Sequence, residues 1–348
     1  MAVVSRSDVE VVVVGEGAVA AAVAWHLARE GRGVLILPQP GTGPGESAAP
    51  VAVRPEDLAS SAPVVASARW WRRVEAETGA ALLSLTDGVD HGAPLRTAAL
   101  ARRLTEANVP HVWLRPDEAE RRWAGMAFGG PVLHQPGTAG RLRPAQAARA
   151  LRAAAVGWGA VVEPAVRVRS VAVDGDDRVR LRTSAGPIRA RRLVVAAGAA
   201  SVGLLPHLPV PSPRVISSRV AGFTPLGINP CIPLENNWPI FADHRRAAAV
   251  AGVPDPCGQV VVALEDAGEQ PVARRRLLDY VAEWLPGLDA TAPTELERAR
   301  VETADGRPVL ASFGPVAFGY GFSDRAIPAA PAIGRELADL ALGARQPA

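Results

Sequence analysis

The sequence predicts a mixed α/β protein in which a Rossmann-like domain is combined with a second, sheet-rich domain. Three observations support this prediction. A β-branched run at 9–14 leads through a glycine-rich turn into a helical stretch. A later hydrophobic run, 188–197, ends at Gly198. Residues 213–265 are strand-like and punctuated by prolines, which indicates a second group of strands. The 348 residues are enough for two domains.

The first element is a β-α-β unit with a G-x-G-x-x-G/A turn. Its strands are expected at Val9–Val14 and Val34–Leu37, and its helix at Ala21–Arg29. Gly15 permits the tight turn, Gly17 leaves room for a pyrophosphate, and the small Ala20 lets helix and strand pack closely. The helix N-terminus offers free N–H groups to a phosphate. The context of this turn therefore predicts a dinucleotide site that includes Gly15, Gly17 and Ala20.

The remaining elements follow from hydrophobic periodicity and turn residues. Helices are expected at Ala66–Thr78, Arg143–Val156, 270–285 and Ile333–Leu342, and strands at Ala160–Val162, Val166–Val173, Val179–Thr183 and 188–197. The neighbours Trp70 and Trp71 point about 100° apart on a helix, so at least one is expected in the core.

The composition excludes several kinds of chemistry. The chain contains no lysine, so all 38 basic residues are arginine, and a lysine Schiff base, a P-loop lysine and a lysine general base are excluded. The net charge of +3 is spread among interleaved acids and arginines, which argues against nucleic acid as a partner. Cys231 and Cys257 form no metal or disulfide pattern, so no metal is expected. With no signal peptide and no apolar span, a soluble cytoplasmic protein without a membrane partner is predicted.

Four stretches, in this order, carry a resemblance to a known family. They are VVVVGEGAVAAAVAWHLAREGRGVLIL, then LHQPGTAGRLRPAQAARALRAAAVGWGAVVEPAVRVRSV, then RRLVVAAGAAS, and finally VETADGRPVLASFG with AFGYGFSDRAIPAAPAIGRELADLAL. Through them the chain resembles a divergent member of the FAD-dependent glycine/sarcosine/D-amino-acid oxidase family over nearly its whole length. The resemblance implies an FAD-binding domain, interleaved in sequence with an antiparallel-sheet domain that covers the substrate.

The same resemblance implies domain limits and cofactor contacts. The FAD-binding domain would comprise 1–85, 140–210 and 300–348, and the substrate-covering domain 86–139 and 211–299. The backbone of Val168 would meet the adenine, Gly198 would end the second nucleotide-contacting strand, and Gly321 would lie near the flavin. FAD would be bound non-covalently, because Glu302 stands near the place of the cysteine that some members link to flavin.

Other departures from the family pattern lie at positions that face the cofactor. Pro38 follows the second strand where an acidic residue usually binds the ribose. Asp324 and Arg325 stand in a turn that is glycine-rich in the family. Val260 is the approximate match to a lysine that activates oxygen in sarcosine-type members. Arg54 is the arginine that could follow the Ser/Gly-rich loop, although a solvated loop charge explains it slightly better. The side chain of Glu16 could face away from the phosphates or, if it faced inward, oppose them.

These features leave three hypotheses. The first is an FAD-dependent oxidoreductase that acts on a C–N bond of an amine or amino-acid-like small molecule, with Arg214 and Arg219 as candidates to hold a carboxylate. The second is a repurposed, flavin-free member that catalyses cyclisation, hydrolysis or isomerisation in the old cleft, so FAD may be absent. The third is a non-catalytic partner subunit, and a homo-oligomer also fits. The candidate catalytic residues are Asp324, Arg325, Tyr320 and His244, with Glu302 as a further acid or base.

Overall fold

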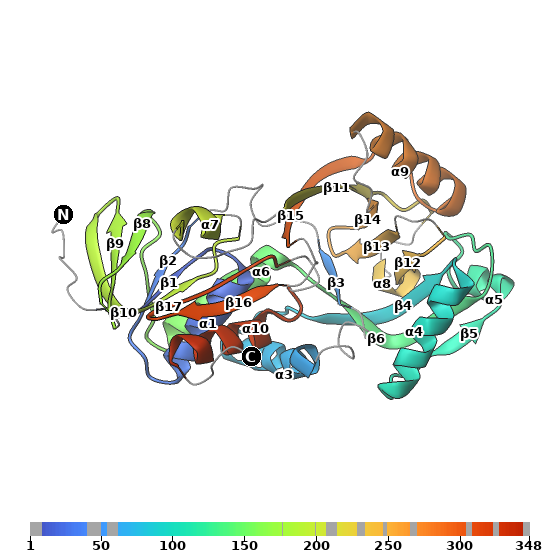
Figure 1. Cartoon of the computed structure of the whole chain (residues 1–348). Helices are drawn as coiled ribbons and strands as arrows, with labels where there is room; N and C mark the ends of the chain where they lie inside the picture. The colour runs from blue at the N-terminus through green and yellow to red at the C-terminus, as the bar shows by residue number, and fades with distance from the viewer. Residues whose placement is uncertain are drawn as a thin grey trace.

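The computed structural model consists of two lobes, each built on its own sheet (Figure 1). The structure describes residues 9–39, 50–53, 62–175, 177–198, 200–206, 214–227, 234–245, 249–264, 270–303, 308–322 and 327–343. Within these ranges, the side chains of 62–66, 214–219, 235–236, 270–271 and 297–302 are not described. The predicted mixed α/β architecture is confirmed.

The sheet of the first lobe has the Rossmann-like core that the sequence predicted. Its strand order is β16-β17-β10-β1-β2-β7, and the hairpin β8–β9 extends it through β10. The strands are β1 (Val9–Val14), β2 (Val34–Leu37), β7 (Val161–Val162), β8 (Val168–Val173), β9 (Val179–Thr183), β10 (Gly186–Val195), β16 (Val309–Phe313) and β17 (Val316–Tyr320). The five strands from β17 to β7 are parallel, and β16 is antiparallel to β17.

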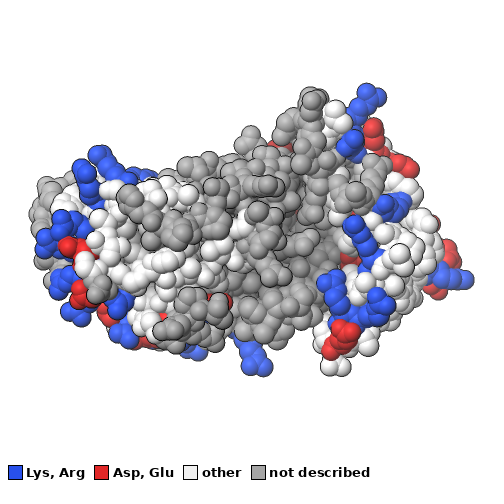
Figure 2. All heavy atoms as spheres, in the orientation of Figure 1, with Lys and Arg blue, Asp and Glu red and all other residues white. Residues whose placement is uncertain are grey.

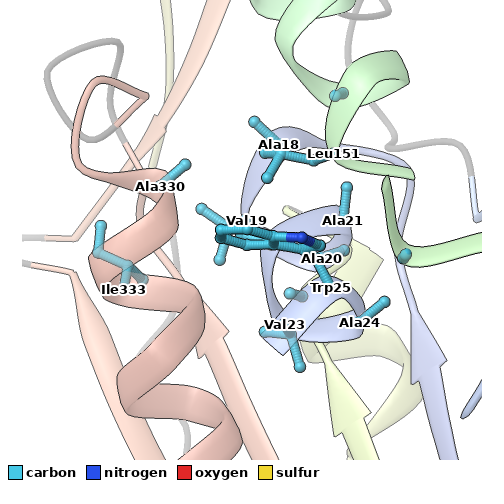
Figure 3. Close-up of a cluster of buried hydrophobic side chains, with 14 of the residues drawn as sticks. Ala18, Val19, Ala20, Ala21, Val23, Ala24, Trp25, Leu151, Ala330 and Ile333 are labelled. Carbon is cyan, nitrogen blue, oxygen red and sulfur yellow. The ribbon is translucent and has the colours of Figure 1, made fainter. Parts of the chain in front are cut away.

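Both faces of this sheet are buried, which explains the apolar run Val11–Val14 in β1. One face carries α1 (Ala18–Arg29), α3 (Ala62–Thr78), α6 (Pro144–Gly157) and α10 (Ala330–Ala341), packed around Val11 and Val13. Figure 3 shows part of this cluster, with Ala330 and Ile333 of α10 beside α1. The opposite face, with Val12 and Val14, packs against the β8–β9 hairpin and the short α7 (Ala200–Leu204). The nucleotide-type turn therefore sits on a rigid, fully packed support.

Small residues let α1 and α10 approach each other closely. Eleven of the twelve residues of α1 are buried, and six of them are alanines, whose small side chains let a neighbouring helix approach the backbone. A Cβ at Gly334 of α10 would lie 2.5 Å from the Cβ of Ala22 and 2.8 Å from its carbonyl carbon. This contact fixes the C-terminal helix against the helix that begins at the glycine turn.

The second lobe is a strongly bent sheet with the order β15-β11-β14-β13-β12-β4-β6-β3, and β5 pairs with β6. Its strands are β3 (Val51–Val53), β4 (Ser84–His91), β5 (Val112–Leu114), β6 (Val132–Leu142), β11 (Arg214–Phe223), β12 (Ile240–Asp243), β13 (Val250–Asp255), β14 (Gln259–Leu264) and β15 (Thr294–Glu302). Its helices are α4 (Pro94–Glu106), α5 (Pro116–Arg122), α8 (Leu234–Asn237) and α9 (Gln270–Trp284). Long strands β4 and β6 run from the middle of the molecule to its far end (Figure 1).

The surface and the helices agree with the charge pattern of the sequence. On the face shown in Figure 2, arginine and acidic side chains are intermixed at both ends of the molecule. Among the described residues, no helix combines the length and the apolar character needed to cross a membrane.

Two aromatic side chains attach the start of α10 to the rest of the first lobe. Trp71, which is 1% exposed, donates from Nε1 to the carbonyl of Pro328 at 2.8 Å, and His26 donates from Nε2 to the carbonyl of Pro331 at the same distance. The expectation that Trp70 or Trp71 lies in the core is confirmed by Trp71. These bonds hold the segment that leads into α10.

Replacing Trp71 with phenylalanine is expected to lower the free energy of unfolding by about 1 to 3 kcal/mol. The change removes the N–H donor, leaves the buried carbonyl of Pro328 without it, and opens a small void. Urea unfolding followed by fluorescence measures the loss. Trp113→Phe is the matched control, because Trp113 is 46% exposed and its change should stay within about 0.5 kcal/mol. Equal losses in the two variants would contradict the prediction.

Candidate functional site

The glycine turn after β1 is wedged between two strands and a helix. Gly15 has a φ of +147°, a conformation that L side chains rarely adopt. A Cβ built on Gly15 would lie 2.3 Å from the carbonyl oxygen of Ala196 and 2.9 Å from the Cβ of Ala20. The amide of Gly15 also donates to the carbonyl of Leu37 at 3.1 Å. The turn thus joins the ends of β1, β2 and β10, and the space has room only for glycine.

The N-terminus of α1 is open to an anion. Gly17 is the N-cap residue, no side chain caps the helix, and the first turn contains no acidic residue. No capping side chain and no acidic side chain of the first turn therefore competes with a phosphate for the backbone N–H groups of this end. Glu16 is exposed, and its carbonyl accepts a hydrogen bond from Arg152 Nη1 at 2.9 Å. The exposed side chain leaves the turn itself without a buried carboxylate.

After β2, the side chain of Gln39 lies next to Pro38, the position at which the usual ribose-binding acid is missing. Gln39 Oε1 accepts a hydrogen bond from the backbone N–H of Val168 at 3.1 Å. Arg167 Nη1 donates to the carbonyl of Pro38 at 3.1 Å, so the two segments are held side by side. Sequence reasoning stopped at Pro38 and missed Gln39. The available signal was that Gln39 is the first polar residue after the strand.

The other predicted cofactor residues lie at strand ends of the same lobe. Gly198 follows β10 with a φ of +57°, and Gly321 follows β17 with a φ of +78° and is buried. Since β1, β10 and β17 are parallel neighbours, Gly15, Gly198 and Gly321 all lie beyond the carboxyl edge of one sheet. This edge is where open α/β sheets bind ligands.

Tyr320 ends β17 in the core of the first lobe. Its side chain is completely buried, and its ring is stacked on that of Phe318 with 6.3 Å between the centroids. Asp324 and Arg325, the other two residues expected beside it, lie outside the described residues, as does Arg54. The structure therefore brings Tyr320 next to Gly321 but gives no solvent access to its ring.

His244 lies in the other lobe, directly after β12, and is paired with a buried carboxylate. Its Nε2 donates to Asp90 Oδ1 at 2.7 Å, and Asp90 Oδ2 accepts from Gln135 Nε2 at 2.8 Å. The side chain of Asp90 is 1% exposed and that of His244 is 22% exposed. The carboxylate fixes the orientation of the ring through Nε2. Asp90 and Gln135 were not expected from the sequence.

Val260, the approximate match to the lysine of sarcosine-type members, lies on β14. Its side chain is fully buried on one face of the sheet, in a cluster with Leu277 and Val281 of α9. Val261, the next residue, lies on the opposite face with Val220. Both faces of β14 are thus apolar at this point, and the absence of a cation on the strand holds in either register.

The candidate residues on β11 and β15 are described only by their backbone. In the antiparallel register of the two strands, the backbone of Arg214 lies opposite Glu302 and that of Arg219 lies opposite Glu297. The expectation that Arg214 and Arg219 lie on a strand is confirmed. Their roles, and that of Glu302, remain predictions.

No group of three or more potential metal ligands occurs among the residues that the structure describes. The groups around the glycine turn instead fit a dinucleotide. The N-terminus of α1 is available for the diphosphate, Gly15 stands where a Cβ would clash with Ala196, and the amide side chain of Gln39 lies beside Val168. The residues present therefore fit the adenosine diphosphate half of FAD.

Comparisons with known proteins agree with this geometry. The sequence profile of the family described as FAD dependent oxidoreductase matches residues 10–340. Monomeric sarcosine oxidase from Streptomyces avermitilis is 27% identical over 365 aligned residues, which cover 96% of this chain and 93% of that protein.

Solved structures of low sequence identity share the fold. NikD, an unusual amino acid oxidase essential for nikkomycin biosynthesis, aligns with a TM-score of 0.80 at 21% identity, over 99% of this chain and 96% of that chain. L-proline dehydrogenase from P. horikoshii aligns with a TM-score of 0.81 at 17% identity, over 98% and 95%. Iminodiacetate oxidase from a Chelativorans species gives 0.76 at 22% identity, over 97% and 96%. Each match spans both lobes.

Proposed function

This chain belongs to the family of FAD dependent oxidoreductases, and from that premise we propose that it oxidises a C–N bond of an amine or amino-acid-like small molecule. The observation that carries the proposal is the turn at Gly15, where the backbone leaves room only for glycine beside an uncapped helix N-terminus. When bound, the flavin would accept the hydride of the substrate C–H bond. The names of the similar proteins, sarcosine oxidase, L-proline dehydrogenase and iminodiacetate oxidase, support this class of substrate.

The first lobe would hold FAD without a covalent bond. Gly15, Gly17 and Ala20 would face the diphosphate, and Gln39 would offer its amide to the ribose in place of the missing acid. Val168 would meet the adenine through its backbone. Gly198 and Gly321 would border the cofactor at the same edge of the sheet. The flavin-free alternative finds no support in this arrangement, because the groups that would recognise the nucleotide are retained.

The second lobe would cover the substrate. We propose the domain limits 1–85, 140–210 and 300–348 for the FAD-binding domain and 86–139 and 211–299 for the substrate-covering domain. The distribution of the strands supports this division in outline. β3 joins the second sheet although it lies within 1–85, and the second-sheet strands β4, β6 and β15 each cross one of the limits by two or three residues. A substrate carboxylate would be held by Arg214 or Arg219. The catalytic roles of Asp324, Arg325, Tyr320 and His244, a cytoplasmic location, and any partner subunit or homo-oligomer remain predictions.

The electron acceptor is proposed to be something other than oxygen. Sarcosine-type members use a lysine to activate oxygen, whereas this chain has no lysine and β14 is apolar around Val260 and Val261. Arginine could supply charge but does not readily give up a proton. We therefore expect that dye-linked turnover exceeds oxygen-linked turnover by at least about tenfold, or about 1.4 kcal/mol in the activation barrier.

The experiment that tests the function begins with the purified full chain. Its absorption spectrum is recorded before and after titration with FAD, and flavin bleaching is then followed anaerobically with sarcosine, glycine, L-proline and iminodiacetate. Reduction by at least one of these amines is the expected result. The turnover rate with dichlorophenolindophenol as electron acceptor is compared with the rate with oxygen as electron acceptor. A chain that takes up no FAD would overturn the proposal.

A further inference from the structure

Arg152 connects helix α6 to the turn that binds the diphosphate. Its guanidinium donates from Nη1 to the carbonyl oxygen of Glu16, the residue between the two turn glycines, at 2.9 Å. The two residues are 136 positions apart in the chain, so the bond depends on how α6 packs on α1. Leu151, the neighbour of Arg152, belongs to the same buried cluster as Ala18 at the start of α1 (Figure 3). The arginine is therefore placed by the core of the lobe.

The bond determines the direction of a second group. In a trans peptide the C=O of one residue and the N–H of the next point in opposite directions, and the described chain contains no cis peptide bond. Because the carbonyl of Glu16 is turned toward α6, the N–H of Gly17 is turned away from it. Gly17 is the N-cap of α1, where amides bind a phosphate. The hydrogen bond from Arg152 to the carbonyl of Glu16 thus fixes the direction of the Gly17 N–H at the phosphate site.

The charge of Arg152 acts in the same direction. A guanidinium always carries its proton and stays within one peptide unit of the turn, so it attracts a diphosphate at every working pH. The side chain of Glu16 belongs to the turn itself, and its exposed carboxylate is screened by solvent. Arg149, on the same helix, is exposed and provides a reference for a charge that does not reach the turn.

We propose that Arg152 is a positioning residue for the diphosphate of FAD, acting through the Glu16–Gly17 peptide rather than on the flavin ring. The inference rests on the proposed FAD-dependent function and adds to it a residue from outside the glycine motif. It gives the chain, which has no lysine, a fixed cation at the nucleotide turn. The isoalloxazine ring and the reacting atoms are not touched by Arg152 in this assignment.

The test measures the affinity of the apoprotein for FAD, ADP and adenosine in Arg152→Met, Arg152→Lys and Arg149→Gln. Kd is obtained from flavin fluorescence quenching for FAD and from calorimetry for the other two compounds. Arg152→Met is expected to raise Kd about tenfold for FAD and ADP and to leave adenosine within about twofold. Arg152→Lys should recover most of the loss, since an ammonium can also donate to the carbonyl. Arg149→Gln should change nothing.

One further readout separates positioning from a general loss of structure. The melting temperature of the apoprotein should be the same in Arg152→Met and the parent within about 2 °C. Equal ADP affinity in Arg152→Met and the parent would overturn the assignment, as would an equal loss for adenosine. If the parent itself binds neither FAD nor ADP, it is the proposed function that fails, and the two failures are thus distinguishable.

Discussion

Replacing Gly15 with alanine is expected to abolish FAD binding at micromolar concentrations and to destabilise the first lobe. The new Cβ would lie 2.3 Å from the carbonyl oxygen of Ala196 and 2.8 Å from its carbonyl carbon, distances at which the backbone of β1 or of the segment after β10 has to shift. The φ of +147° adds backbone strain of about 1 to 3 kcal/mol for an L residue. Overpacking of a buried contact costs about the same again. A shift of the turn also misplaces the amides of α1.

The measurements are the Kd for FAD and the free energy of unfolding of the apoprotein. We expect Kd to rise at least about 100-fold, which corresponds to about 2.7 kcal/mol, and stability to fall by at least about 2 kcal/mol. Gly203→Ala is the matched control, because Gly203 is exposed on α7, has ordinary backbone angles and has open space at its Cβ. Undiminished FAD binding in a folded Gly15→Ala protein would contradict the assignment of this turn.

Gly17→Ala separates binding from folding if the first variant is too unstable to purify. Gly17 has a φ of −72° and a ψ of 173°, which alanine adopts without strain, so the apoprotein should fold. Alanine is a poorer N-cap than glycine by less than about 1 kcal/mol. FAD binding should nevertheless weaken about tenfold, because the added methyl group stands where the diphosphate approaches. Unchanged affinity for FAD here would show that the diphosphate is not held at this turn.

Local sequence patterns predicted the glycine turn correctly, but they predicted the ends of helices less accurately. The turn depends on neighbours in the chain, and the strand, turn and helix of the first unit all occur where the sequence indicated. Helix α1 begins at Ala18, three residues before the predicted Ala21, and α10 begins at Ala330 instead of Ile333. Both first turns are rich in alanine, with Ala18 and Ala20 in α1 and Ala330 and Ala332 in α10. Alanine has the highest helix propensity, so a periodic pattern of large side chains misses the first turn of such helices.

The parts of the site that were not predicted depend on contacts between distant segments. Gln39 meets Val168 across 129 positions, Arg152 meets Glu16 across 136, and His244 meets Asp90 across 154. None of these pairs has a spacing motif. The match of Val260 to the lysine position stays a prediction, because in a strand of consecutive valines one residue of slip turns every side chain to the other face and the composition does not reveal it.

The stability of the protein is expected to fall steeply between pH 6.5 and pH 4.5 because of two buried histidines. His26 is 1% exposed and His91 is 2% exposed, and burial lowers the pKa of each ring from its usual 6.5 to about 4. His26 donates to Pro331, and His91 Nε2 finds no hydrogen-bond partner among the described residues. Between pH 4 and pH 6.5, both rings are thus neutral in the folded protein, whereas the same rings are protonated in the unfolded chain.

The sign and the size of this pH dependence follow from the difference in proton binding between the folded and the unfolded state. Between the folded pKa of about 4 and the unfolded value of 6.5, the unfolded state binds up to two more protons, so stability is complete above pH 6.5 and is lost as the pH falls toward 4. At pH 4.5 each ring accounts for roughly 2.5 kcal/mol, and the two together for roughly 5 kcal/mol, a large part of the stability of an ordinary domain. Carboxylates act at lower pH: the hydrogen bond from His134 lowers the pKa of Asp87 from 3.8 to about 2, so Asp87 affects stability only below the histidine window.

Urea unfolding at pH 7.5, 6.5, 5.5 and 4.5 measures this dependence, and histidine-to-glutamine variants assign it. His26→Gln keeps an N–H donor for the carbonyl of Pro331 but does not titrate, so its free energy of unfolding should fall about half as steeply with pH as that of the parent. His91→Gln should do the same, and the double variant should be nearly flat between pH 5 and 6.5. Each variant is compared with the parent by slope, because any loss of packing is the same at every pH and leaves the slope unaffected. A double variant with the parent's slope would show that other groups carry the acid sensitivity, and that the rings of α1 and β4 are not held neutral by burial.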